Sequence, residues 1–158
     1  MAQNITAKYG TSNQSITCTI TSLANNGQRQ STAIDNTSNL FLDALVQVKV
    51  KANSSGTSAT GYVAVYAYGT ADGGTTYDDT CTGTDGGVTL TAPPNVVLLG
   101  VINLVANSGV GIRTFSVASA FGGILPDHWG IVVENKSGAT LDASVGQAKY
   151  QGVFAYAA

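Results

Sequence analysis

Residues 40–51 read LFLDALVQVKVK, and in the second half of this stretch apolar and polar side chains alternate. Valines at every second position from 46 to 50 fall on one side of an extended chain, whereas Gln47, Lys49 and Lys51 fall on the other. Side chains of a β-strand point alternately to its two faces. The stretch therefore predicts a half-buried strand with its valines in a core.

The next strand-like stretch, residues 61–69, reads GYVAVYAYG and is partly apolar on both faces. Tyr62, Tyr66 and Tyr68 share one of these faces. We interpret the tyrosine row as a surface packed against a second sheet or a neighbouring subunit. The alternative is an aromatic platform for a sugar ring. In either case the three tyrosines are the candidate subunit or ligand face.

Strand signals continue along the chain, and helical periodicity is almost absent. Further candidate strands are residues 15–23, 87–91, 96–104, 112–120, 129–134, 139–143 and 148–156. Turn sequences rich in Gly, Asn, Asp and Pro separate them, among them 25–27, 53–56, 71–74, 84–87, 92–95, 107–109 and 135–138. This pattern predicts an all-β fold: an antiparallel β-sandwich of about eight to nine strands.

Two polar regions lie outside this pattern. Residues 1–14 are expected to form an extended polar N-terminal arm, and residues 15–158 a single sandwich domain. Residues 25–39 read as a second arm or long loop, in which Ala33 and Ile34 could form a short strand. Residues 69–87 form the most acidic segment and are also expected to be a loop.

Composition excludes several classes of protein. The chain has 158 residues, of which 44% are hydrophobic and only 10% charged, with a formal net charge of -2. This length suits one domain, and the apolar fraction argues against disorder. Because acidic residues outnumber basic ones, no positively charged surface that would bind nucleic acid is expected. The longest apolar run, residues 96–106, is about half of the roughly 20 residues that a membrane-spanning helix needs, so no membrane partner is expected.

Groups that could perform catalysis are few. His128 is the single histidine and Glu134 the single glutamate, and no GxSxG elbow or glycine-rich phosphate loop occurs. Most aspartates lie in turns, where they cap backbone N–H groups; the acidic loop could bind Ca²⁺ but lacks the DxDxDG spacing. Cys18 and Cys81 neither demand nor exclude a disulfide and are favoured as free, largely buried thiols. A cysteine–histidine pair remains open, but neither cysteine lies in a nucleophile motif. We expect no enzyme activity, cofactor or metal.

A family resemblance follows from four stretches. They are QSTAIDNTSNLFLDALVQVKVK from residue 30, YVAVYAYGTADGGTTYDD from residue 62, and FGGILPDHWGIVVENKSGATLD from residue 121, with the closing YQGVFAYA. Together they resemble small virion proteins of tailed bacteriophages, which form jelly-roll-like β-sandwiches and act as capsid decoration, or cement, proteins. The resemblance covers residues 30–156, and the polar segment before Gln28 departs from it.

The resemblance implies a location and partners. The chain would be made in the cytoplasm of a bacterial host and bind the outer surface of the assembled phage head. It would form a homotrimer and bridge subunits of the major capsid protein, with its N-terminal arm paired with a neighbour and the tyrosine face internal or between subunits. The alternative function is a receptor- or glycan-binding β-sandwich module of a phage tail or fibre.

Overall fold

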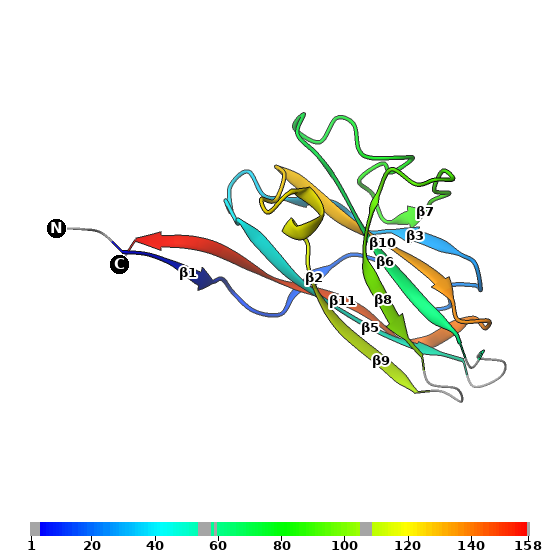
Figure 1. Ribbon diagram of the computed structural model, residues 1–158. Helices are drawn as coiled ribbons and strands as arrows, with labels where there is room; N and C mark the ends of the chain where they lie inside the picture. Colours follow the sequence, from blue (N-terminus) through cyan, green and yellow to red (C-terminus); the bar gives the residue numbers. More distant parts are fainter. Residues whose placement is uncertain (1–3, 54–57, 59, 105–108, 158) are drawn as a thin grey trace.

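A computed structural model describes residues 4–53, 58, 60–104 and 109–157. In this part of the chain, two antiparallel sheets pack face to face, as the sequence predicts (Figure 1). The first sheet contains β1 (Ile5–Tyr9), β2 (Gln14–Ile16), β5 (Asp43–Ala52), β9 (Val110–Ser116) and β11 (Leu141–Ala157). The second contains β3 (Gln28–Gln30), β4 (Ile34–Asp35), β6 (Tyr62–Thr70), β7 (Gly86–Gly87), β8 (Val97–Asn103) and β10 (His128–Lys136). A short 3₁₀ helix, η1 (Ala118–Phe121), follows β9.

The strand order is that of a jelly roll. The first sheet has the order β1-β11-β5-β9, with β2 also beside β11, and the second has β7-β3-β10-β6-β8, with β4 also beside β10. We take β1 with β2, and β3 with β4, as two interrupted strands and leave the two-residue β7 aside. Eight strands then remain in chain order. The first pairs with the last (β1 with β11), the second with the seventh (β3 with β10), the third with the sixth (β5 with β9) and the fourth with the fifth (β6 with β8). A long antiparallel hairpin rolled into two sheets has this pairing, which confirms the expected jelly-roll-like sandwich.

The core forms where alternate residues of the two sheets meet. Val46, Val48 and Val50 of β5 are fully buried, and their counterparts on the other sheet include Val65 of β6 and Trp129 of β10. The alternation in residues 46–51 thus has the orientation that the sequence predicts. Each buried valine side chain contributes about 1.5–3 kcal/mol relative to an exposed one.

The strand count and several boundaries differ from the prediction. Eleven strands are present in the described residues. The prediction had fewer because short polar strands such as β3 lack the alternation of apolar and polar residues that indicates a strand. Of the predicted strand 15–23, only Ser15 and Ile16 pair with β11, together with Gln14 before them. The chain then turns, with a positive φ at Ser22, and still buries Ile20. The predicted strands 139–143 and 148–156 are one strand, β11, with a register shift between Leu141 and Gly146.

Some predicted features lie outside the described residues: the first three residues of the arm, most of the turn at 53–56, and two residues of the turn at 107–109. In the part of the chain that the structure describes, no helix is long and apolar enough to cross a membrane.

The connection between β6 and β8 folds over the outer face of the second sheet. Its acidic part is anchored by Asp85, whose carboxylate accepts hydrogen bonds from Arg29 Nε at 2.7 Å and from Thr19 Oγ1 at 2.6 Å. The backbone N–H of Asp85 donates to Thr32 Oγ1 at 3.2 Å. Asp85 therefore joins this connection to β3 and to the irregular segment after β2.

The anchor makes stability depend on pH. The hydrogen bond from Arg29, followed by those from Thr19, outweighs the effect of burial and lowers the pKa of Asp85 to about 2. The unfolded value is about 3.9. A carboxyl with a lowered folded-state pKa stabilises the fold above its unfolded pKa and loses this contribution as pH falls through the folded value.

We therefore expect Asp85→Asn to lower the free energy of unfolding by about 1 kcal/mol at pH 7, after allowance for solvent screening. The difference from wild type should shrink between about pH 5 and pH 2. Urea unfolding at a series of pH values measures it. A difference that stays constant over this range would contradict the ion-pair anchor.

Candidate functional site

The predicted tyrosine face lies on the outer side of the second sheet, but its three members differ in environment. Tyr62 is exposed (37%), Tyr66 is half-buried and Tyr68 is fully buried. The Tyr68 hydroxyl donates to the backbone carbonyl of Ser31 at 2.6 Å, and its ring meets Tyr77 edge to face at 5.5 Å. Tyr68 is thus covered by its own chain, which agrees with the internal alternative, whereas a subunit or ligand face at Tyr62 and Tyr66 stays a prediction.

A second small core accounts for this burial. The connection between β6 and β8 places apolar side chains over the outer face of β6 and β10. The cluster contains Tyr68, Cys81, Val96 and Val132, packed against Ala33, Tyr66, Tyr77, Val88 and Leu90. On β10, the ring of Tyr68 lies so close to Gly130 that a Cβ there would be 2.4 Å from it. The part of the outer face around Tyr68 and Val132 is therefore covered within one chain.

Glu134 is a structural acceptor in this region. Its carboxylate accepts hydrogen bonds from Gln28 Nε2 at 2.8 Å and Tyr66 Oη at 3.0 Å, and Lys136 Nζ lies at 3.1 Å. Burial would raise the pKa of Glu134, but these partners outweigh it and lower the pKa. Burial and the bond to Glu134 raise the pKa of Tyr66 to about 12. The network fixes β3, β6 and β10 to one another.

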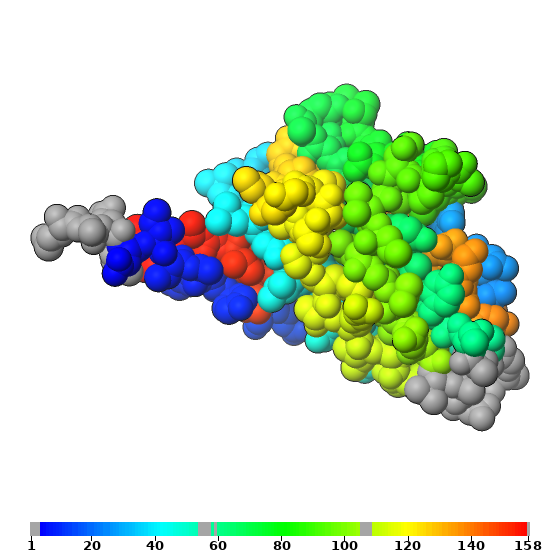
Figure 2. All heavy atoms as spheres, viewed as in Figure 1, coloured from blue at the N-terminus to red at the C-terminus, as the bar shows by residue number. Residues whose placement is uncertain are grey.

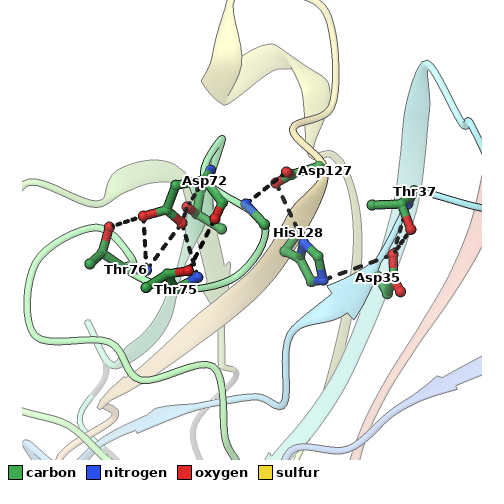
Figure 3. Close-up of polar contacts among 9 residues, drawn as sticks. Asp35, Thr37, Asp72, Thr75, Thr76, Asp127 and His128 are labelled. Atoms are coloured by element: carbon green, nitrogen blue, oxygen red, sulfur yellow. Dashed lines mark hydrogen bonds and ion pairs between the residues drawn. The ribbon is translucent and has the colours of Figure 1, made fainter.

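His128 lies between two carboxylates at the start of β10 (Figure 3). Its Nδ1 is 3.4 Å from Asp127 Oδ1, and its Nε2 is 3.9 Å from Asp35 Oδ1. Asp127 Oδ2 accepts a hydrogen bond from the Gly73 N–H at 3.0 Å, and Asp35 accepts two from Thr37. These contacts hold the ends of β4, β6 and β10 together.

The remaining turn aspartates cap backbone, as predicted. Asp72 accepts from Thr70, Thr75 and Thr76, and these bonds hold its pKa well below the ordinary value. Asp79 accepts from the N–H groups of Thr91 and Asn95. Among the residues that the structure describes, no group of three or more His, Cys, Asp or Glu side chains is placed to hold a metal ion.

Cys18 and Cys81 are free thiols. Burial, and then nearby carboxylates, raise the pKa of each to about 12. A thiol with such a pKa stays protonated at neutral pH, whereas nucleophilic cysteines need a lowered pKa. Cys81 is buried and Cys18 is half-buried against the main core, so both side chains take part in packing.

The most unusual surface is a terminal ribbon, formed by β1 and the last residues of β11. Antiparallel pairs run from Ile5 with Ala157 to Tyr9 with Val153. The ribbon extends beyond the sandwich and forms a protrusion in the space-filling view (Figures 1 and 2). The described part of the expected N-terminal arm thus pairs with the C-terminal strand of its own chain.

Both edges of the ribbon are open within the described residues. β1 lies at the end of its sheet, with β11 as its strand partner. β5 accompanies β11 only as far as Val153, so the β11 residues beyond it pair on one side. An open edge carries unpaired N–H and C=O groups that can pair with another chain.

The ribbon also exposes apolar side chains. One face carries only Ile5, Ala7, Tyr9, Val153, Ala155 and Ala157. Ile5 is 75% exposed and Tyr9 is 61% exposed. On the other face, Lys8 Nζ lies 4.5 Å from the centroid of the Tyr156 ring. A two-stranded ribbon with such faces buries little apolar surface, so it has only marginal stability by itself.

The sequence reasoning missed this apolar face, although a signal was present. Ile5, Ala7 and Tyr9 alternate with Thr6 and Lys8, which is the pattern of a half-buried strand. The abundance of Asn, Gln and Ser around it favoured a polar arm.

No protein-family model matches the chain, and no curated protein matches it.

Burial of Tyr68 allows a direct test with a matched control. Tyr68→Phe leaves the buried Ser31 carbonyl without its donor, so we expect the free energy of unfolding to fall by about 1–3 kcal/mol. Tyr62→Phe removes the same atom from an exposed ring and should change it by less than about 0.5 kcal/mol. Urea denaturation of both variants provides the measurement. Equal effects would mean that the β6–β8 connection does not cover Tyr68 in solution.

Proposed function

We propose that the protein is a virion structural protein, a capsid decoration (cement) protein that binds the outer surface of an assembled phage head. The terminal ribbon is the observation that carries this proposal. It offers open strand edges and exposed apolar side chains that the described residues leave uncovered, and such a surface suits contact with another protein subunit. The jelly-roll strand order and the sequence resemblance support the same function.

The proposed mechanism is mechanical and involves no catalysis or cofactor. A decoration protein that bridges major capsid subunits binds the assembled shell and not the loose subunit, and therefore shifts the equilibrium towards assembly. Each specific contact needs about 800 Å² per partner. Many identical copies, which we propose to be homotrimers, make the total stabilisation large even when each contact is weak.

The low charge of the chain suits such contacts. Only 10% of the residues are charged, and much of this charge is already paired within the chain, as in Arg29 with Asp85, Lys51 with Asp142 and Lys136 with Glu134. Cores of protein interfaces are depleted in charged residues. A surface with few free charges is therefore less costly to desolvate.

A second candidate is a receptor- or glycan-binding module of a tail or fibre. It is favoured by a shallow groove of about 230 Å³ on the outer face of the first sheet. Amide and hydroxyl side chains line it, among them Asn13, Gln47, Gln151 and Thr114. Such groups suit hydrogen bonding to sugar hydroxyls.

Electron microscopy of purified particles separates the two candidates. We expect density for the protein on the outer surface of the head, repeated with the symmetry of the shell. Density confined to tail tips, together with saturable binding on a glycan array, would replace the decoration function by the receptor function.

The contribution of the ribbon can be tested by measuring how much of the protein binds to undecorated heads. Ile5→Asp places a charge in its apolar face, so we expect at least a tenfold loss of binding to undecorated heads, since burying an unpaired charge costs several kcal/mol. Leu98→Asp is the control, because Leu98 is also exposed (52%) but lies on β8, away from the ribbon. Co-sedimentation with heads measures both. Equal binding of the two variants would show that the ribbon is not part of the contact.

A further inference from the structure

The charged residues of the chain are divided unequally between the two sheets. The strands of the first sheet contain five of the seven lysines and arginines but two of the nine acidic residues, which gives them a formal charge of +3. The rest of the chain contains two basic and seven acidic residues and has a formal charge of -5. A protein with a formal net charge of -2 therefore has one positively charged sheet. Such a division of charge attracts and orients a charged partner.

Two lysines on the outer face of the first sheet have no ion-pair partner among the described residues. The buried valines of β5 point into the core, so Gln47 and Lys49 between them point outwards. Gln47 is paired with Lys149 of β11, and Lys49 with Gln147, so all four side chains share one face. We call this outer surface around Lys49 and Lys149 the lysine face.

Both carboxylates of the first sheet are already engaged, at opposite ends of β5. Asp142 Oδ2 lies 3.2 Å from Lys51 Nζ. Asp43, the first residue of β5, accepts hydrogen bonds from Ser116 Oγ at 2.7 Å and from the Ala118 N–H at 2.8 Å. The middle of the lysine face therefore keeps a positive charge that no carboxylate of its own sheet balances.

Two shallow depressions lie on the lysine face, and each contains one of the two lysines. The groove of about 230 Å³ described above includes Lys149, and a second depression of about 150 Å³ includes Lys49 and Gln147. The described lining of both contains no Asp or Glu. Ammonium groups and side-chain amides donate hydrogen bonds to carboxylates. The chemistry of the lysine face therefore fits a surface that presents several carboxylates.

The lysine face continues into the apolar face of the ribbon. β11 runs from the sandwich into the ribbon as one strand (Figure 1). Its register is constant from Gly146 to Val153 beside β5, and from Val153 to Ala157 beside β1. Every second side chain of this stretch therefore lies on the same side of the sheet. That side carries Gln147, Lys149 and Gln151 in the sandwich, and Val153, Ala155 and Ala157 in the ribbon.

We propose that the lysine face and the apolar face of the ribbon form the side of the protein that turns towards the shell, and that the shell protein presents Asp or Glu side chains opposite Lys49 and Lys149. This inference rests on the proposed function, because it names the chemistry of the surface that is bound. The acidic connection between β6 and β8 then points away from the shell. Complementary charges beside an apolar contact fix its orientation, speed association and suppress wrong partners.

A protein partner fits this surface better than an acidic polysaccharide does. The lysines and amides alone would suit either, because both can present carboxylates. The same surface, however, ends in Ile5, Tyr9 and Val153 on the ribbon. Apolar side chains of a protein can cover these residues, whereas a polyanionic chain cannot.

Co-sedimentation with undecorated heads tests the orientation. Lys49→Gln with Lys149→Gln should weaken binding by at least about tenfold at low salt, and by less at about 0.5 M salt, where exposed charges are screened. Lys136→Gln is the control, because Lys136 lies on the second sheet and already pairs with Glu134; it should change binding by less than about twofold. Circular dichroism verifies that the variants fold. Equal binding of the lysine-face variant and the control would overturn this inference and leave the proposed function intact.

Immobilised polyglutamate tests the lysine face without heads. At low salt we expect the full chain to be retained despite its formal net charge of -2, and the Lys49→Gln, Lys149→Gln variant to pass through. A wild type that passes through would refute the acidic partner, whatever the heads show. Retention that depends on both lysines, in a protein that never binds heads, would instead refute the proposed function alone. Tighter retention on alginate, with heads bound equally by wild type and variant, would assign the lysine face to a polysaccharide and reject the proposal.

Discussion

The central strands of the six-stranded sheet are apolar on both faces, and covering both faces is the constraint on which the rest of the structure depends. The inner face of β6 and β10 packs against the five-stranded sheet through Val63, Val65 and Ile131. The outer face needs a second layer, which the β6–β8 connection supplies over Tyr68 and Val132. The long acidic loop is therefore a structural layer, and its aspartates shape the turns that let it lie flat.

Polar groups are used mainly to hold this layer in place. Glu134 accepts hydrogen bonds from Gln28 and Tyr66 across the second sheet, while Asp85 joins Arg29 to Thr19. A buried polar group without a partner costs about 1–3 kcal/mol, so these hydrogen bonds stabilise the layer. Because the chain has few charges and several of them are paired within it, the outer surface carries many neutral polar groups and exposed apolar side chains. Such a surface suits repeated contacts between subunits.

The ends of the chain form the surface that we propose for those contacts. β1 and the end of β11 stabilise one another, yet they leave two open edges and an apolar face outside the sandwich. Leu40, at a φ of 53°, and Ile124 line an exposed apolar hollow at the end of the sandwich from which the ribbon extends. Weak association through such surfaces becomes strong when a symmetric shell repeats it many times.

Local sequence determined the fold class, because strand periodicity and turn residues act over a few positions: residues 46–51 and 62–69 gave the orientation of β5 and β6 directly. It did not determine β3, since Gln28 and Gln30 look like loop residues until Glu134 and Thr82 bind them. It placed Tyr62, Tyr66 and Tyr68 on one face, but only the tertiary structure decided that Tyr68 is covered, in part by residues such as Val96 and Leu90 that are more than ten positions away. The ribbon and the hollow likewise join segments from distant parts of the chain. Which surfaces stay open depends on long-range packing, which no local pattern encodes.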